Sequence, residues 1–460
     1  MTTPGMPAAG VHPFAPVAAT PSADHNAALL DMLAAWLPKQ RWFPGRDSTV
    51  SELLPISDIT LRSGDPALRH LILEARVHGV TARFQVLVGG RLQPPPVIGT
   101  ALIGTQAGVT WYDALHDPDL AGELILSIGE QRTAGQLRFV REPASPRLAG
   151  RWPAARVLTV EQSNTSLVFG ELAIMKVLRR LFPGANPDLE VADALARIGS
   201  ARVAAPYGWI ETDLDGEPVL LAVLSEFLSG ASDGWSLALD SLSAAMPFAA
   251  EAQLLGEATA ELHADMATAF GIHELGRPEL TAMAGSMHTK LTDAVAAVPE
   301  LGQHEHRIRL AYDAVAEVAG PVPVQRIHGD YHLGQVMRSK HGWVALDFEG
   351  EPAMPLTQRR ALAPALRDVA GMLRSFDYAA RHQLIGHPEA GTAAAVADDW
   401  VRQCQVGFQA GYAARGGTDP ARHDTLLRAL TLEKAVYEVV YEYRHRPAWL
   451  SVPLGFVAAA

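Results

Sequence analysis

Two neighbouring stretches decide the fold of this chain: VPVQRIHGDYHLGQ at residues 322–335 and GWVALDFEGEP at residues 342–352. In the first, a short strand-like run leads into His-Gly-Asp, which ends at Asp330. In the second, a fully apolar run leads directly into Asp347. Two strands that each deliver an aspartate, joined by a short polar loop, can place two carboxylates near one another. We therefore predict one site that uses both acidic groups.

Phosphoryl transfer is the chemistry that needs such a pair. One aspartate accepts the proton of the attacking hydroxyl, and a second aspartate with an amide oxygen holds Mg²⁺ on the phosphates. Gln335 follows Asp330 by the spacing at which protein kinases place their metal-binding Asn. Each aspartate alone is equally typical of an ordinary turn after a strand. The flanking His328 and His332 would also allow a zinc site, although the kinase spacing fits them better, with His328 orienting the loop.

The first stretch resembles the catalytic loop of aminoglycoside phosphotransferases and related small-molecule kinases, and residues 328–380 resemble the maltokinases. The likeness includes WLPKQRWFPGRD at 36–47 and EKAVYEVVYEYRHRPAWLSVPL at 433–454, and it spans roughly residues 27–455. Maltokinases transfer the γ-phosphate of ATP to the anomeric hydroxyl of maltose, which gives maltose 1-phosphate and ADP. The resemblance therefore implies ATP and Mg²⁺ as cofactors and maltose as substrate.

Residue by residue, the resemblance makes Asp330 the catalytic base and makes Gln335 and Asp347 the Mg²⁺ ligands. Gln335 stands where the broader kinase group has Asn, and the longer side chain shifts the amide oxygen by about one bond. Asp368, in an amphipathic helix, is expected to brace the catalytic loop from below.

The nucleotide side is predicted from a turn, a strand and a helix. Backbone N–H groups and hydroxyls of the turn EQSNTS can meet phosphate oxygens, which makes Ser163, Asn164, Thr165 and Ser166 candidates, although the motif alone is also typical of a plain hairpin. Lys176 lies in an apolar strand, where it must reach solvent or meet an anion. In kinase-like folds a strand Lys contacts phosphates and is held by a helix Glu, here Glu190. The strand at 219–227 resembles the one that enters the interlobe hinge, so that Glu226 and Leu228 would offer backbone groups to adenine.

The acceptor side is predicted on one helix. Lys434, Tyr437, Glu438 and Tyr441 share one helix face, and periodicity alone favours a solvated face with a Lys–Glu pair. The resemblance assigns this face to maltose. Further candidate sugar contacts are His332, Glu349 and Tyr378.

Composition narrows the class of protein. The 460 residues carry 50 Asp plus Glu against 38 Lys plus Arg, a formal net charge of −12 at pH 7. Nucleic-acid binders lean to positive charge, so we expect no such partner. Cys404 is the sole cysteine, which excludes a disulfide framework and is typical of the cytoplasm. Apolar runs are far shorter than a membrane span, and the start lacks the early positive charge of a targeting peptide.

These features predict an α+β, bilobal protein-kinase-like fold with a strand-rich N-lobe, a helical C-lobe and an extra N-terminal cap domain. We expect a disordered tail at 1–24, the cap at 25–130, the N-lobe at 131–228 and the C-lobe with the catalytic loop at 229–460. Within the cap, the spacing predicts a helix over 25–37 and short strands over 50–129.

The expected activity is that of an ATP:maltose 1-phosphotransferase, which would feed α-glucan synthesis. One alternative keeps the scaffold and phosphorylates glucosamine or another sugar, with Glu349 or Glu438 on an ammonium group. The other is a pseudokinase-like binding module whose cap docks a partner. Maltokinases associate with trehalose synthase, and the stretch at 39–46 is a candidate docking surface by analogy.

Overall fold

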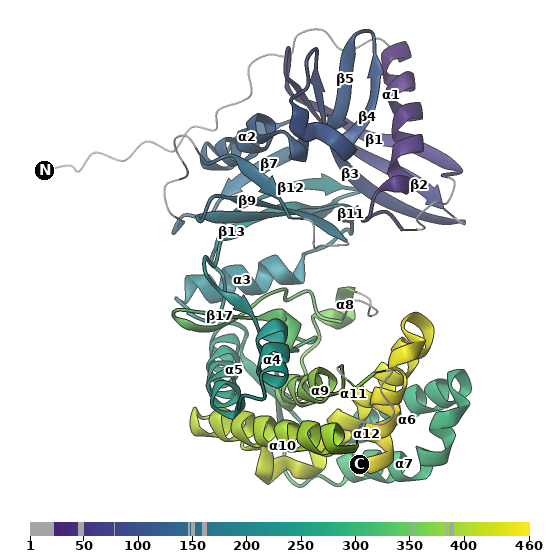
Figure 1. Cartoon of the computed structure of the whole chain (residues 1–460), viewed down its shortest axis with the longest axis vertical. Helices are drawn as coiled ribbons and strands as arrows, with labels where there is room; N and C mark the ends of the chain where they lie inside the picture. The colour runs from purple at the N-terminus through teal and green to yellow at the C-terminus, as the bar shows by residue number, and fades with distance from the viewer. Residues whose placement is uncertain are drawn as a thin grey trace, which may run out of the picture. The chain divides into compact units, whose positions relative to one another are not determined.

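The computed structural model divides into two compact units, each described by itself (Figure 1). It describes residues 23–44, 50–77, 79–145, 148, 152–158, 163–351, 354, 356–382, 384–385 and 391–460. The N-terminal unit runs to Leu189 and adds Ala205–Ser229, and the C-terminal unit contains Glu190–Ala204 and the chain from Gly230 onward. Residues 1–22 of the predicted tail lie outside the described residues, and helix α1 (Ala23–Trp36) begins at its last two positions.

The N-terminal unit contains two antiparallel sheets. Over the described residues, the first has the order β1-β2-β3-β5-β4, with β11 paired to β3. Its strands are β1 (Glu52–Arg62), β2 (Ala67–Val77), β3 (Val80–Arg91), β4 (Leu102–Gln106), β5 (Val109–Asp113) and β11 (Arg180–Leu181). The second has the order β6-β7-β12-β13-β10-β9-β8. Its strands are β6 (Thr133–Ala134), β7 (Leu137–Arg141), β8 (Ala155–Val157), β9 (Asn164–Phe169), β10 (Ala173–Leu178), β12 (Pro206–Leu214) and β13 (Glu217–Glu226).

The central strands β2 and β3 of the first sheet carry buried side chains on both faces. Because side chains alternate along a strand, Leu71 and Leu73 of β2 pack with Leu33 and Trp36 of α1, whereas Ile72 packs with the core of the second sheet. That second core also includes side chains of the predicted N-lobe, such as Leu137, Leu167 and Met175. The predicted division at residue 130 therefore crosses a continuous core, and it stays a prediction.

One helix of this unit was not predicted. The sequence analysis assigned residues 50–129 to strands, but α2 (Pro118–Gly129) is helical. The signal was available, because the Asp117 side chain caps the helix by accepting a hydrogen bond from the Asp119 amide and Pro118 occupies the first turn. The apolar run in LAGELILSIG resembles a strand only when these start signals are ignored.

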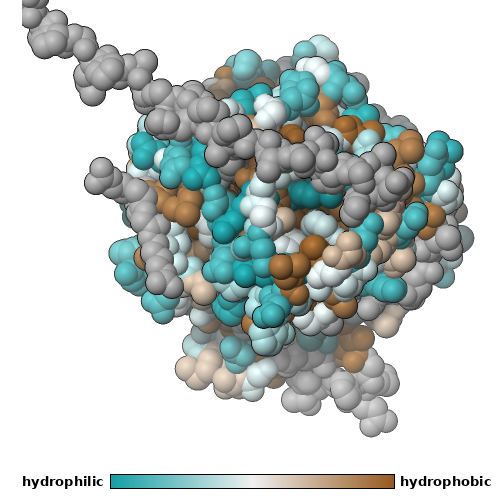
Figure 2. Space-filling view, turned by 90° about the horizontal axis from the view of Figure 1, so that it is seen from above, coloured by the Kyte–Doolittle hydropathy of each residue, from teal (hydrophilic) through white to brown (hydrophobic). Residues whose placement is uncertain are grey.

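The outer surface of the N-terminal unit mixes hydrophilic residues with scattered hydrophobic ones (Figure 2). Exposed apolar side chains of this kind are normal on a soluble surface. In this unit they include Leu54, Ile56, Val80 and Leu102. None of the helices in the described part of the chain combines the length and apolar character needed to cross a bilayer.

The C-terminal unit is mainly helical. It receives most of α3 (Pro187–Arg197) and contains α4 (Gly234–Ser243), α5 (Ala249–Phe270), α6 (Arg277–Ala297), α7 (Glu305–Ala316), α8 (Leu356–Arg359), α9 (Leu366–His382), α10 (Gly391–Ala414), α11 (Asp424–His445) and α12 (Ser451–Ala459). Two small antiparallel sheets interrupt the helices. They consist of β15 (Ile272–Leu275) with β16 (Val322–Gln325), and of β14 (Ser232–Asp233), β17 (Val336–Ser339) and β18 (Gly342–Ala345).

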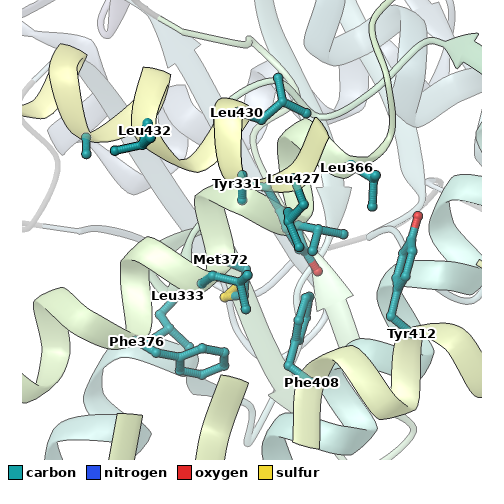
Figure 3. Packing of buried hydrophobic residues seen from close by; sticks show 14 of the residues in the cluster. Tyr331, Leu333, Leu366, Met372, Phe376, Phe408, Tyr412, Leu427, Leu430 and Leu432 are labelled. Carbon is teal, nitrogen blue, oxygen red and sulfur yellow. The ribbon is translucent and has the colours of Figure 1, made fainter. Parts of the chain in front are cut away.

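The core of the C-terminal unit holds the 322–352 region in place. Figure 3 shows Tyr331 and Leu333, from the catalytic stretch, among the buried side chains of α9 and α11, which include Met372, Phe376 and Leu430. The Leu333 amide also donates a hydrogen bond to the Ser375 hydroxyl at 3.0 Å. The stretch that carries Asp330 is therefore anchored both by packing and by a hydrogen bond to α9.

Candidate active site

The predicted catalytic loop, residues 328–335, is held by one buried carboxylate. Asp368, at the start of α9, is 1% exposed. Its Oδ2 accepts a hydrogen bond from the His328 amide at 2.7 Å, and its Oδ1 accepts one from the Gly329 amide at 2.9 Å. The prediction that Asp368 braces the loop is confirmed. Asp330 is the next residue along the chain, so this carboxylate sets the backbone from which Asp330 projects.

Asp368 is itself held by a series of side-chain hydrogen bonds that the sequence did not indicate. His263 Nε2 lies 3.1 Å from Asp368 Oδ2, and His263 Nδ1 lies 2.8 Å from the Tyr412 hydroxyl. Burial alone would raise the pKa of Asp368, but the hydrogen bond and charge of His263 hold it below its usual range. His263 is thus a buried residue of α5 that bonds directly to the carboxylate beneath the catalytic loop.

Asp330 faces a lysine and a histidine. Lys434 Nζ lies 3.1 Å from Asp330 Oδ1, and His332 Nε2 lies 3.9 Å from Oδ2. Burial alone would raise the pKa of Asp330, but the charge and the hydrogen bond of Lys434 hold it below its usual range. Although burial opposes it, the charges of Asp330 and Glu351 raise the pKa of Lys434. Asp330 is therefore ionised near neutral pH and can accept a hydrogen bond from a hydroxyl.

The second predicted aspartate meets the predicted glutamine. Gln335 Nε2 donates to Asp347 Oδ2 at 3.3 Å, and the His328 ring bonds to the Leu346 carbonyl at 2.8 Å. The last contact ties the catalytic loop to the residue before Asp347, which confirms that His328 orients the loop. Asp347 has a φ of 61°, a conformation that is strained for a residue other than Gly and is often found at functional sites.

The donors around Asp347 suit a hard divalent cation. A carboxylate oxygen of Glu349 lies within 4.8 Å of one of Asp347, and the Gln335 amide offers a neutral oxygen. Carboxylate and amide oxygens are the ligands that Mg²⁺ takes in proteins. Glu349 was predicted to contact sugar. The structure places it beside Asp347 instead. The described residues that line the pocket beside Asp330, which is described next, do not include Glu349.

A pocket of about 480 Å³ opens beside Asp330 within the C-terminal unit. Seven of the residues predicted to catalyse or to contact sugar line it, which leaves out only Glu349: Asp330, His332, Tyr378, Lys434, Tyr437, Glu438 and Tyr441. The lining also contains side chains that the sequence analysis missed, namely Trp235, Ser375, Glu442, Arg446 and Trp449. Its size falls in the range of small-molecule sites.

Aromatic rings and ion pairs alternate around this pocket. The rings of Tyr437 and Tyr441 stack with centroids 6.2 Å apart, and those of Tyr378 and Trp449 stack at 6.2 Å. The Tyr378 hydroxyl donates to Glu442 Oε1 at 3.3 Å. Flat rings can cover the C–H faces of a sugar, while the charged groups take its hydroxyls.

On the nucleotide side, Lys176 keeps its predicted strand but pairs differently. Lys176 lies in β10, on the face opposite its buried neighbours Met175 and Val177. Its Nζ lies 3.6 Å from Asp188 Oδ2. Glu190, the predicted partner, instead forms ion pairs with Arg326 at 3.1 Å and Arg360 at 2.6 Å. The correction amounts to two positions along α3, a spacing that turns a carboxylate to another face of the helix.

The predicted phosphate turn is largely strand. Glu161 and Gln162 lie outside the described residues, and β9 begins at Asn164. The Thr165 hydroxyl accepts a hydrogen bond from Arg179 Nε at 2.9 Å, and Ser166 is buried. Hydroxyl contacts to phosphate from these two residues are therefore not supported; Ser163 is exposed and, with Asn164, stays a prediction.

The predicted hinge begins where β13 ends. The Glu226 amide donates to the Ala205 carbonyl at 2.9 Å, so this amide is already used within the N-terminal unit. Adenine contacts by the remaining backbone groups of Glu226 and Leu228 stay a prediction.

Comparison with known proteins identifies the family. Residues 36–117 match the maltokinase N-terminal cap domain. A glucosamine kinase of Streptacidiphilus jiangxiensis is 33% identical over 321 residues, which cover 65% of this chain and 71% of that protein. The chain belongs to the family of these glucosamine kinases. A second member, from Mycolicibacterium smegmatis, is 30% identical over 322 residues, covering 65% of this chain and 77% of that protein.

The solved structures agree with this family. A glucosamine kinase in complex with glucosamine, ADP and inorganic phosphate superposes with a TM-score of 0.66 at 26% identity, covering 94% of this chain and 98% of the other. The predicted kinase-like α+β fold with an N-terminal cap is thereby confirmed. The protein is a small-molecule kinase of the glucosamine kinase family, and the maltokinase resemblance holds for its cap.

Proposed function

We propose that the protein transfers the γ-phosphate of ATP to a hydroxyl of an amino sugar of the glucosamine type. The observation that carries the proposal is the pocket beside Asp330, where an ionised carboxylate stands at the edge of a sugar-sized space with stacked aromatic rings. Two relatives are named glucosamine kinases, and one solved glucosamine kinase structure contains glucosamine and ADP. These findings support the choice of acceptor and nucleotide.

The charges of the pocket are compatible with an ammonium group. Three carboxylates line it, those of Asp330, Glu438 and Glu442, against the two permanent cations of Lys434 and Arg446. The side chain of His332 adds no charge near neutral pH because burial lowers its pKa. The lining therefore contains more carboxylates than permanent cations, an arrangement that is compatible with a cationic acceptor.

In the proposed reaction, the acceptor hydroxyl donates a hydrogen bond to Asp330 and attacks the γ-phosphorus. The bond between the γ-phosphorus and the bridging oxygen breaks, ADP leaves, and the hydroxyl proton passes to Asp330. Lys434 holds the carboxylate that receives this proton, at 3.1 Å. Asp347 and Gln335, with Glu349, are the residues that would hold Mg²⁺, which neutralises phosphate charge when bound. Lys176 would meet the remaining phosphates. Most of the rate then comes from positioning and electrostatics.

Maltose is the second candidate acceptor. The match of residues 36–117 to the maltokinase cap favours it, as does the resemblance of the stretch at 433–454. Feeding of α-glucan synthesis and association with trehalose synthase depend on that resemblance alone, and a cytoplasmic location depends on the single cysteine.

An acceptor screen tests the proposal. The full-length protein is incubated with ATP and Mg²⁺ and one of glucosamine, glucose, N-acetylglucosamine or maltose, and ADP release is followed. Glucose is the matched control, because it differs from glucosamine by one hydroxyl in place of the amine. We expect the highest kcat/KM for glucosamine. A higher kcat/KM for maltose would mean that maltose, and not glucosamine, is the acceptor. The absence of ADP release with every sugar would favour the pseudokinase alternative.

A further inference from the structure

A fully buried arginine lies beneath the acceptor pocket without lining it. Arg374, in α9, is 1% exposed. Its Nε donates to Glu438 Oε2 at 2.8 Å, and its Nη1 donates to Asp377 Oδ2 at 2.8 Å. Burying a guanidinium is unfavourable unless it is paired and hydrogen-bonded. Here one of its partners, Glu438, is a pocket residue.

Aromatic faces hold the same guanidinium from other sides. Its Cζ lies 4.1 Å from the ring centroid of Phe456 in α12 and 5.4 Å from that of Tyr378. Cation–π contacts fix the orientation of a planar guanidinium, whereas the ammonium of a lysine would stay free to turn. The position of Arg374 is therefore determined by two carboxylates and two rings.

We propose that Arg374 is a positioning residue for the acceptor: it fixes the Glu438 carboxylate from below and keeps it negative, so that Glu438 presents its Oε1 to the amine or hydroxyls of the bound sugar. The inference rests on the proposed function, since it assigns acceptor recognition to Glu438. It also explains why a chain would retain a buried charge at this place, where an apolar side chain would pack at lower cost.

The charge state of Glu438 depends on this arginine. Burial raises the pKa of Glu438, and the largest opposing influence is the charge of Arg374. The other charged or titratable groups that face Glu438 are Asp377 and Tyr378 from α9 and Lys434 from its own helix, with Glu442 one turn further on. Lys434 is shared with Asp330 and Glu351, so Arg374 is the cation most closely committed to Glu438.

Removal of this charge therefore has a specific consequence. Without Arg374, the pKa of Glu438 rises further, and the carboxyl becomes neutral at a higher pH. Acceptor binding that needs the carboxylate is then weakened near neutral pH and recovers as the pH is raised. A residue that only supported the fold would lower all kinetic constants without moving the pH profile.

Arg374→Met is the test, measured as KM for glucosamine and for ATP between pH 6 and pH 9. We expect KM for glucosamine to rise about tenfold or more at pH 7, KM for ATP to stay within about twofold, and the acid limb of kcat/KM for glucosamine to move to higher pH. Arg381→Met is the matched control, because Arg381 lies on the same helix and pairs with Asp377 and Asp398. We expect the control to keep the wild-type profile.

A second variant covers loss of folding. In Arg374→Met/Glu438→Gln, both charges are removed together, which avoids an unpaired carboxylate at Glu438, while Asp377 keeps its ion pair with Arg381. The double variant should fold and keep the raised KM for glucosamine, but without the shift of the acid limb. An unchanged KM for glucosamine in either variant, or an equal rise in KM for ATP, overturns the proposal. The wild-type enzyme reports separately on the proposed function: if it prefers another acceptor in the screen, the same comparison is made with that acceptor.

Discussion

Asp368→Asn perturbs the catalytic loop without touching the pocket. The carboxylate accepts three hydrogen bonds, from the amides of His328 and Gly329 and from the His263 ring. An Asn side chain has one acceptor oxygen, so at least one backbone N–H would face an NH₂ group. A hydrogen bond to a charged group contributes about 1.5–3 kcal/mol, and an unsatisfied buried donor costs about 1–3 kcal/mol more.

We therefore expect the free energy of unfolding to fall by about 3–5 kcal/mol. We also expect kcat to fall about 10²-fold, because each 1.4 kcal/mol of lost loop placement is a factor of about ten. Urea unfolding followed by tryptophan fluorescence measures the first quantity, and ADP release at saturating substrates measures the second. Because the pKa of Asp368 lies below its usual range, its contribution to stability is present at neutral pH and is lost as the pH falls through the folded-state pKa.

The control is Asp240→Asn, at an exposed aspartate of α4, which should change stability by less than about 0.5 kcal/mol. If Asp368→Asn lost no more stability than this control and kept the wild-type kcat, the view that Asp368 holds the loop would be wrong.

Three further predictions concern separate parts of the molecule. A Cβ on Gly371 would lie 2.6 Å from the Tyr331 carbonyl oxygen, so Gly371→Ala should lose about 2 kcal/mol of stability and lower kcat. The control Gly285→Ala, in open space on α6, should gain about 0.5–1 kcal/mol. Equal urea midpoints for the two variants would contradict the close packing at Gly371. Tyr441→Ala should raise KM for the sugar about tenfold and leave KM for ATP unchanged; an unaltered sugar KM would place the acceptor elsewhere. Burial lowers the pKa of His70 from 6.5 to about 4, so the unfolded state binds more protons between these values and stability should fall as the pH drops from about 6.5 to 4; His70→Leu should flatten Tm across this range, and a slope equal to that of the wild type would refute the assignment.

Sequence reasoning succeeded where local pattern and chemistry coincide. Each of three patterns predicts both a type of element and the side on which its residues lie. They are the two strand-like runs that lead to Asp330 and Asp347 and the i, i+3, i+4, i+7 stripe on α11. The brace by Asp368 came from the resemblance to related kinases, with its amphipathic helix as the only local signal. By contrast, α2 was missed because its apolar run outweighed the cap at Asp117.

The parts of the site that could not be predicted depend on tertiary neighbours. Arg374 and Trp449 join the acceptor site only because α9, α11 and the chain after α11 pack together, and no spacing within one element indicates that. The partner of Lys176 was placed on Glu190 rather than Asp188, because the sequence does not state which face of α3 turns toward β10. The hydrogen bond to the Thr165 hydroxyl likewise comes from Arg179, which lies between β10 and β11.

The measurement that tests the central claim most directly is the turnover of Asp330→Asn beside its nucleotide affinity. If Asp330 receives the proton of the attacking hydroxyl, ADP release at saturating glucosamine should fall about 10²-fold or more, while ATP affinity measured by calorimetry stays at the wild-type value. Turnover near the wild-type rate with this variant would contradict the account.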